Sequence, residues 1–390
     1  MGRAVNSDPY LQLGVRPILN AAGHMTDYGG SIPDPRVLTA MHRAAEQFVE
    51  IRALQSAVHK RLAELTRNDA AYVTCGATAA IYLATAAAVS EHYGAVIDSV
   101  SQDRIQQSIV LVPAGCRSPY DVAVRQCGVQ LREVTGGAAQ LKRLISPDVV
   151  AVLHAPAAWN EPGTPSLKDV ASVAHDAGLP LIVDAAAQIP PVANLWAITS
   201  AGATVAIFSG GKSLAGPQST GLLLGREHLI AWIGRIGFPN DGFGRMFKVG
   251  RDELVGILTA VEIVLDAEEQ TRVEWFEAQV SRFVDALSGH PFLVVSREFP
   301  NIAGQPIPFV LVRSKDATVG TAALAAELRA GEPSVVVGPV PGRSDLHDGF
   351  IVNPLALRND DMQTIAAALR EVAGTLSRRV AGSPRLGASH

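Results

Sequence analysis

One lysine in a glycine-rich run carries the strongest chemical signal in this sequence. Lys212 lies in the run Phe-Ser-Gly-Gly-Lys-Ser at 208–213, directly after a run predicted to form a buried strand. A lysine amine crowded by glycines at a strand end is partly desolvated, which lowers its pKa and makes it nucleophilic toward an aldehyde. The hydroxyl of Ser209 could bind a phosphate on the same ligand. The run therefore predicts a lysine that forms a Schiff base with a cofactor.

The same run partly matches a nucleotide-binding phosphate loop, GxxxxGK[ST]. That loop needs a glycine five residues before Gly211, but Ala206 stands there, inside the predicted strand. The mismatch disfavours a nucleotide site. An ordinary surface lysine in a turn is the remaining alternative, and three other features count against it.

The first feature is an acid at the end of another predicted strand. Asp184 follows the apolar residues 181–183, and ligands of open α/β sheets bind at the carboxyl ends of such strands. A carboxylate there can hold the protonated ring nitrogen of pyridoxal phosphate (PLP) and keep the ring an electron sink. The alternative is a solvated acid or a helix N-cap.

The other two features are a small-residue turn and further polar groups at strand ends. Thr74-Cys75-Gly76-Ala77-Thr78 follows a predicted strand and opens an Ala-rich helix, whose free amides suit a phosphate. His154 and the pair Cys116-Arg117 also follow predicted strands. A core histidine and a surface arginine are the simpler explanations of these two sites.

Composition and missing motifs exclude several other classes. Hydrophobic residues are 48% and charged residues 18% of 390, which is a globular balance. The net charge of -4 disfavours binding of nucleic acid through its phosphates. The three cysteines form no CxxC pair, and no HExxH, GxSxG or strand-linked GxGxxG motif occurs. A metal site, a serine hydrolase and a nicotinamide dinucleotide site are therefore not expected.

Short apolar runs alternate with helical patterns along the middle of the chain. The runs are continuously apolar, as in strands buried on both faces of a parallel sheet, and they lie at 71–74, 108–113, 149–155, 179–185 and 204–210. Helices are predicted between them at 77–90, 119–127 and 166–177. This alternation predicts a doubly wound α/β sheet.

The rest of the chain predicts a second domain. One long helix is expected over 250–276, followed by a smaller α+β domain with strands near 292–299, 309–314, 334–340 and 349–357 and helices at 321–331 and 361–376. We expect an N-terminal arm (1–45), a large domain (46–265), a small domain (266–380) and a tail (381–390). The N-terminus has no signal-peptide pattern, and the apolar stretch 70–89 is Ala-rich and polar in places. A cytoplasmic protein without membrane contact is expected.

Longer motifs resemble a known family. The chain resembles the selenocysteine-synthase-like branch of fold-type-I PLP enzymes, and within it the D-glucosaminate-6-phosphate ammonia-lyase family. The matching segments are 13–23, 29–31, 73–77, 120–121, 125–128, 183–188 and, most specifically, 208–221 (FSGGKSLAGPQSTG). The resemblance covers most of the chain. It implies a PLP-transferase fold of type I, with a mostly parallel sheet in the large domain and an α+β C-terminal domain.

The resemblance also implies roles for individual residues. Lys212 would bind PLP covalently and handle the substrate Cα proton, and Asp184 would pair with the ring nitrogen. Other cofactor contacts would come from Cys75, Gly76, Ala77, Thr78, Cys116, Ala186, Gln188, Ser209 and Thr220. Among these, the amides of 76–78 would bind the phosphate, Ala186 would lie under the ring, and Thr220 or Ser219 would reach a neighbouring subunit's phosphate.

Two departures from the family pattern concern the substrate. The family usually reads Gly-His-Arg where this chain has Gly115-Cys116-Arg117, so substrate or reaction type can differ. The small-domain stretch 349–353 lacks the arginine that often binds a substrate carboxylate, which leaves Arg358 or Arg343. The substrate-binding candidates are Arg117, Arg358, Asn20 and Gly30.

Together these observations predict a PLP-dependent ammonia-lyase. It would act on an amino-sugar acid or a β-hydroxy amino acid, with or without a phosphate, and form at least a homodimer. A racemase, epimerase or β-substituting transferase would use the same residues up to loss of the Cα proton. A binding protein that keeps the fold without turnover is the alternative from another class.

Overall fold

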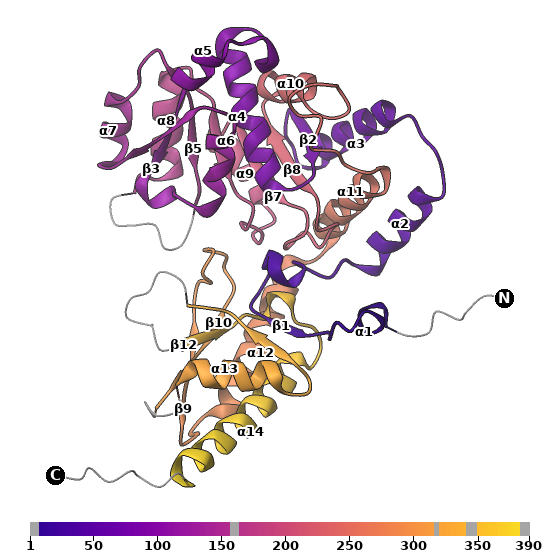
Figure 1. Cartoon of the computed structure of the whole chain (residues 1–390), viewed down its shortest axis with the longest axis vertical. Coiled ribbons are helices and arrows are strands. Elements are labelled where there is room, and N and C mark those ends of the chain that lie inside the picture. Colours follow the sequence, from indigo (N-terminus) through magenta and orange to yellow (C-terminus); the bar gives the residue numbers. More distant parts are fainter. Residues whose placement is uncertain (1–7, 157–163, 316–319, 341–348, 383–390) are drawn as a thin grey trace. The chain divides into compact units, whose positions relative to one another are not determined.

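The computed structural model describes residues 8–156, 164–315, 320–340 and 349–382, with side chains up to residue 378. These residues divide into two compact units, and each unit is described by itself (Figure 1). Unit 1 holds the described parts of 1–28, 270–301 and 306–390. Unit 2 holds those of 29–269 together with the short segment 302–305.

Unit 2 is built on a seven-stranded, mostly parallel sheet. Its strand order is β2-β8-β7-β6-β5-β3-β4. The strands are β2 (Ala70–Thr74), β3 (Ile109–Pro113), β4 (Gln130–Val134), β5 (Val149–His154), β6 (Leu181–Asp184), β7 (Val205–Ser209) and β8 (Gly221–Gly225). Only β8 runs against the others, pairing antiparallel with both β2 and β7. The carboxyl ends of β2, β3, β5, β6 and β7 therefore lie along one edge of the sheet.

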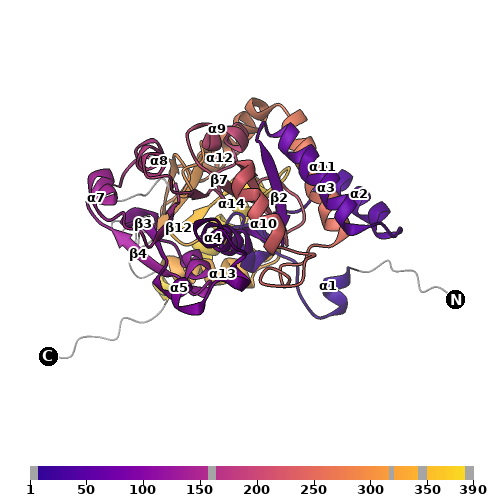
Figure 2. The ribbon, with the colours of Figure 1, turned by 90° about the horizontal axis from the view of Figure 1, so that it is seen from above.

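Helices cover both faces of this sheet (Figure 2). One face packs against α4 (Ala77–Tyr93), α6 (Val122–Gln126) and α10 (Glu227–Ile236). The other packs against α3 (Ile51–Leu65), α8 (Leu167–Asp176), α9 (Asn194–Ser200) and α11 (Arg251–Asp266). The remaining helices of the unit are α2 (Pro35–Ala45), α5 (Gln102–Gln107) and α7 (Gly137–Arg143). The inner strands are mostly apolar because both of their faces are buried.

The α/β fold class and the five strands predicted from apolar runs are confirmed, but two further strands were missed. β4 exposes Gln130, Arg132 and Glu133 at the edge of the sheet, so it lacks a continuous apolar pattern. β8 is a short Gly-Leu-Leu-Leu-Gly run inside a glycine-rich region. Helix α8 begins as predicted, since the Ser166 hydroxyl accepts a hydrogen bond from the Asp169 amide.

Unit 1 combines a small antiparallel sheet with helices. The sheet order is β12-β10-β9, and a separate parallel pair joins β1 to β11. Its strands are β1 (Leu19–Ala21), β9 (Leu293–Glu298), β10 (Phe309–Ser314), β11 (Val335–Val337) and β12 (Gly349–Val352), and its helices are α1 (Pro9–Gln12), α12 (Glu269–Leu287), α13 (Thr321–Ala330) and α14 (Asp361–Gly382). Residues 19–21, assigned by sequence to an arm, lie in this unit because β1 pairs with β11.

The single helix predicted over 250–276 is wrong, because the structure has two helices there. α11 ends at Asp266, Ala267 is extended (ψ 142), and α12 begins at Glu269. Leu254 and Ile257 of α11 pack in the core of unit 2, whereas Val280 and Phe283 of α12 pack in that of unit 1. The break therefore separates segments that serve different cores. No described helix is long and apolar enough to cross a membrane.

Candidate active site

Two candidate residues, Asp184 and Ser209, lie on one face of the sheet in unit 2, next to the turn that carries Lys212. Side chains alternate between faces along a strand. Ile182 and Ile207 pack on the α4 face, so Asp184 and Ser209, two residues further along β6 and β7, lie on that face too. Because β6 and β7 are adjacent, with Asp184 opposite Ile207, both side chains end next to the turn that follows β7.

That turn holds Lys212 through backbone hydrogen bonds. The Gly210 amide donates to the Thr220 carbonyl (2.9 Å), and the Gly216 amide donates to the Gly210 carbonyl (2.8 Å). A Cβ atom on Gly211 would be 2.5 Å from the Cα of Gln218, so the turn closes only with glycine there. The side chain of Lys212 is half-buried.

Lys212 and Asp184 shift each other's pKa. Burial lowers the pKa of Lys212 below its usual 10.5, and the charge of Asp184 offsets part of that change. Burial raises the pKa of Asp184 above its usual 3.8, while a hydrogen bond from the Ala186 amide (3.1 Å to Oδ1) and the charge of Lys212 oppose the rise. A partly desolvated amine with a lowered pKa next to a carboxylate with a raised pKa is typical of catalytic sites.

The N-terminus of α4 is open for an anion. Gly76, its N-cap, has φ 134, a conformation that favours glycine, and no side chain caps the first turn. A Cβ atom on Gly76 would meet no heavy atom within 4 Å. On the other side, a Cβ on Gly221 would be 2.4 Å from the Gly76 carbonyl oxygen and 2.7 Å from the Ala77 nitrogen. Gly221 thus allows β8 to pass directly under the open amides.

A segment from before the first strand of unit 2 supports the lysine turn. The Ser31 amide and hydroxyl both donate to the Gly211 carbonyl, at 2.9 and 3.0 Å. Gly30 packs against the same carbonyl in a left-handed conformation, φ 71. The structure therefore places Gly30 beside Gly211, the residue that precedes Lys212.

These features fit PLP. The half-buried amine of Lys212 suits an aldehyde, and the carboxylate of Asp184 suits a protonated ring nitrogen. The uncapped amides of α4 and the open space at Gly76 suit a phosphate. Among the described residues, no group of three His, Cys, Asp or Glu side chains could hold a metal ion.

Two cysteines and a histidine at this edge are buried to different degrees. Cys75, next to Gly76, is half-buried, and Cys116 is 2% exposed; burial raises the pKa of both thiols, which stay protonated near neutral pH. His154 is also 2% exposed, and burial lowers its pKa. It follows Leu153, which packs on the α4 face, so His154 lies on the face opposite to Asp184.

The remaining residues predicted to contact the cofactor differ in their burial and in their free hydrogen-bonding groups. Thr78 is exposed, Ala77 and Ala186 are half-buried, and Thr220 is fully buried. The Thr220 hydroxyl donates to the Pro217 carbonyl (2.6 Å). Gln188 uses both amide hydrogens, one to the Pro156 carbonyl (2.9 Å) and one to the Ala303 carbonyl (2.8 Å). Only its side-chain oxygen remains to accept a hydrogen bond from a ligand.

The substrate candidate Arg117 lies in an ion-pair cluster. Its guanidinium donates to Asp121 and, at 2.6 Å, to Glu133, and Arg125 donates to the other oxygen of Asp121 (2.9 Å). The Asp121 side chain is 4% exposed, and both arginines lower its pKa against the effect of burial. A substrate carboxylate would have to compete with these two acids for Arg117.

Two substrate candidates belong to unit 1. The side chain of Asn20 serves a local turn, donating to the Gly23 carbonyl (2.9 Å) and accepting from the Ala22 amide (3.0 Å). Arg358 is exposed, and its amide donates to Asp361 (2.8 Å). Arg343 lies outside the described residues.

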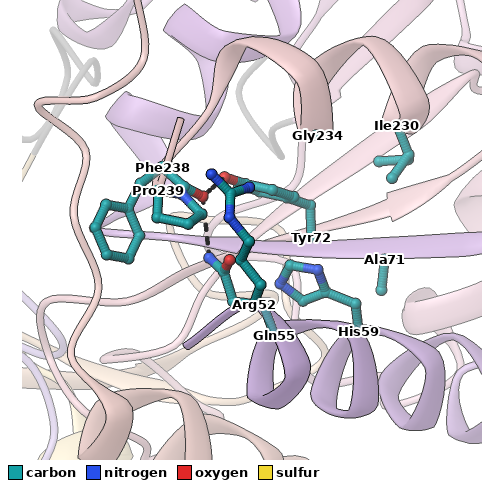
Figure 3. A pocket seen from close by; sticks show the side chains of 9 residues that line it. All are labelled: Arg52, Gln55, His59, Ala71, Tyr72, Ile230, Gly234, Phe238 and Pro239. Atoms are coloured by element: carbon teal, nitrogen blue, oxygen red, sulfur yellow. Dashed lines mark hydrogen bonds between the residues drawn. The ribbon is translucent and has the colours of Figure 1, made fainter. Parts of the chain in front are cut away.

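A separate pocket of about 250 Å³ lies between α3, β2 and the turn at Phe238-Pro239 (Figure 3). Three of its polar side chains bind backbone groups. His59 Nε2 accepts from the Val73 amide (3.1 Å), and Tyr72 and Gln55 donate to the Phe238 carbonyl (2.8 and 3.1 Å). Burial lowers the pKa of His59 to about 4. These contacts cover the free edge of β2, a structural role.

Sequence reasoning missed three contributors to the site. Gly221 was part of the 208–221 motif, but its contact with Gly76 needs the pairing of β8 with β2. Ser31 was likewise part of a motif without an assigned role. Gln305, whose side chain reaches Ser213, carried no sequence signal.

Known proteins resemble this chain over nearly its full length, although no protein-family model matches it. D-glucosaminate-6-phosphate ammonia lyase from Salmonella typhimurium (strain 14028s / SGSC 2262) is 31% identical over 93% of this chain and 97% of its own length. A 5'-C-glycyluridine monooxygenase-decarboxylase from Streptomyces sp is 29% identical over 93% of this chain and 91% of its own.

A solved structure agrees with the first of these relatives. The structure of D-glucosaminate-6-phosphate ammonia-lyase matches with a TM-score of 0.78 and 28% identity, covering 96% of this chain and all of that one. The fold, the lysine–aspartate pair and the full-length similarity agree with one another. The chain therefore belongs to the D-glucosaminate-6-phosphate ammonia-lyase family, a family of PLP-dependent enzymes of fold type I.

Proposed function

We propose that this enzyme is an ammonia-lyase for an amino-sugar acid or another β-hydroxy amino acid. The observation that carries the proposal is the pairing of two half-buried residues of opposite charge, Lys212 and Asp184, beside the uncapped N-terminus of α4. Membership in the ammonia-lyase family supports the reaction type, and the relative's amino-sugar acid supports the substrate class.

Lys212 is proposed to bind the cofactor and to move the Cα proton. Its lowered pKa keeps more of the amine neutral than in an exposed lysine, so Nζ can attack an aldehyde and later accept a proton. Bound PLP supplies an electron sink for the electron pair of the broken Cα–H bond.

Asp184 and the start of α4 are proposed to hold the cofactor at its two ends. The Asp184 carboxylate would accept a hydrogen bond from the ring nitrogen and keep it protonated. The amides of Gly76, Ala77 and Thr78, assisted by Ser209, would bind the phosphate. Cys75, Cys116, Ala186, Gln188 and Thr220 are proposed to complete the surroundings of the ring and phosphate.

The proposed net reaction is an α,β-elimination followed by hydrolysis. The Cα proton passes to Lys212, and the β-hydroxyl leaves as water after it takes up a proton. A second water then releases ammonia and leaves a 2-keto acid. Arg117 or Arg358 is proposed to bind the substrate carboxylate, with Asn20 and Gly30 as further contacts.

The test compares wild type with Lys212→Ala after incubation with PLP. We expect a visible absorbance band in wild type only, and borohydride should fix PLP on the peptide that contains Lys212. With D-glucosaminate 6-phosphate and simple β-hydroxy amino acids, ammonia and a 2-keto acid should form in equal amounts. A wild type without band or label contradicts the proposal.

Other products would show that the enzyme catalyses a different reaction. Solvent deuterium at Cα without ammonia would indicate a racemase or epimerase. Oxygen consumption with loss of carbon dioxide would place the protein with its monooxygenase-decarboxylase relative. The same assay run without oxygen separates that outcome from elimination.

We also propose that the enzyme is a cytoplasmic homodimer or larger homo-oligomer. The three cysteines are unpaired, as in proteins of a reducing compartment. Phe48 is 98% exposed, and Leu38 and Val49 are about half exposed, which leaves apolar side chains that a second subunit could cover. Light scattering should give at least twice 41.0 kDa, and Phe48→Ser should lower that mass.

A further inference from the structure

A short segment distant in sequence packs beside the lysine turn. Residues 302–305, which lie between β9 and β10, belong to unit 2. The Gln305 side chain is 3% exposed and donates from Nε2 to the Ser213 hydroxyl (3.3 Å) and to the Ile189 carbonyl. Ser213, itself 3% exposed, follows Lys212 directly.

A second glutamine, Gln188, also binds this segment. Gln188 follows Asp184 by four residues, and its Nε2 donates to the Ala303 carbonyl (2.8 Å) and the Pro156 carbonyl (2.9 Å). The Gln188 carbonyl in turn accepts from Asn194 (2.6 Å). The two glutamines thus link the segment 302–305 to the chain that leaves β6, each donating to a backbone carbonyl of the other segment.

These hydrogen bonds restrict the two chain segments that carry Asp184 and Lys212. An amide that donates to a carbonyl is fixed in orientation, because oxygen cannot take the place of nitrogen there. A buried carbonyl that loses its donor is left unsatisfied, so the network resists rearrangement. Through Gln188 the segment is tied to the strand of Asp184, and through Gln305 to the turn of Lys212.

We propose that Gln305 is a positioning residue for Lys212, acting through the Ser213 hydroxyl. Gln305 sets the distance and direction of Lys212 relative to Asp184, and it contacts neither the cofactor nor the substrate itself. The inference rests on the proposed function of Lys212. A glutamine that served folding alone would affect stability without changing the behaviour of the lysine.

The test uses Gln305→Leu, with Gln55→Leu as the matched control. Gln55 is also a buried glutamine of unit 2 (6% exposed) that donates to a backbone carbonyl, but it lines the pocket at Phe238-Pro239. The first readout, taken without substrate, is the pH midpoint of the visible band of the PLP-loaded protein. The second is the separate change of kcat and KM.

For Gln305→Leu we expect the pH midpoint to move by about half a unit or more relative to wild type. We expect kcat to fall about tenfold, with KM changed less than about threefold. Gln55→Leu should leave the midpoint and kcat at wild-type values. Ser213→Ala removes only the hydroxyl that links Gln305 to the turn, so it tests the proposal even if Gln305→Leu fails to fold; the same shift is expected.

Unchanged midpoints in Gln305→Leu and Ser213→Ala, with wild type showing its band, would overturn this inference and leave the proposed function intact. Equal shifts in Gln55→Leu would also overturn it, because the effect would then be a general loss of stability. A wild type without a band would contradict the proposed function itself.

Discussion

Gly30 lies against Gly211 so closely that a Cβ atom on Gly30 would be 2.4 Å from the Gly211 carbonyl oxygen. Substituting Gly30 should therefore displace the turn that carries Lys212. We expect Gly30→Ala to weaken PLP binding by about tenfold or more, as expected when a binding residue is misplaced by about 1 Å. The dissociation constant is measured by titrating apoprotein with PLP and following the visible band.

Gly29→Ala is the matched control for this effect. Gly29 also has a left-handed conformation (φ 85, against 71 for Gly30), but only a Gln218 side-chain oxygen lies near its Cβ position, at 4.0 Å. Both variants should lose about 1 kcal/mol of stability from backbone strain. Equal PLP affinities in the two would contradict the role assigned to the Gly30 contact.

A methyl group on Gly221 should damage the phosphate site proposed at the N-terminus of α4. Its Cβ would overlap the carbonyl of Gly76 and the nitrogen of Ala77, so Gly221→Ala should push the helix N-terminus away from β8. We expect weaker binding of PLP and of inorganic phosphate as its competitor. In Gly234→Ala, a control in helix α10 where a Cβ meets nothing within 4 Å, phosphate competition should match wild type.

The reaction of apoprotein with PLP should depend on pH through Lys212. The neutral amine reacts with the aldehyde, so the rate should rise with pH and level off below pH 10.5, because burial lowers the lysine pKa. The charge of Asp184 opposes that lowering, so Asp184→Asn should move the midpoint to still lower pH. Stopped-flow absorbance measures the rate; a midpoint at or above 10.5 in wild type would contradict the assignment.

His59 should make the protein less stable in acid. Its pKa is near 6.5 in the unfolded chain and about 4 when folded, so between these values the unfolded state binds a proton that the folded state does not. The contribution of His59 to the free energy of unfolding is fully present above pH 6.5. It decreases as the pH falls from 6.5 to 4, by about 3 kcal/mol in total. Urea unfolding at successive pH values measures the loss.

His59→Gln should reduce this acid sensitivity. The glutamine side-chain oxygen can still accept from the Val73 amide, but it does not titrate. His175→Gln, on the exposed surface of α8, is the control, and its free energy of unfolding should change with pH as in wild type. If the free energy of unfolding depends on pH identically in His59→Gln and wild type, other groups cause the loss of stability in acid.

The sequence by itself determined five strands of the sheet and the two central residues, Asp184 and Lys212. Runs such as 179–185 and 204–210 are apolar enough to form strands only if buried on both faces, and the parallel crossovers bring their carboxyl ends to one edge. Asp184 and Lys212 follow those runs, so their convergence depends on local pattern and chain order alone.

Only the tertiary structure decided how these residues are supported. Gly30 reaches Gly211, and Gln305 reaches Ser213, across 181 and 92 positions, distances over which local pattern has no influence. The break between α11 and α12 likewise contains no proline or glycine, and follows from packing against two different cores. Such contacts arise when whole elements pack, because close packing selects glycine and buried amides by shape and hydrogen bonding rather than by neighbouring sequence.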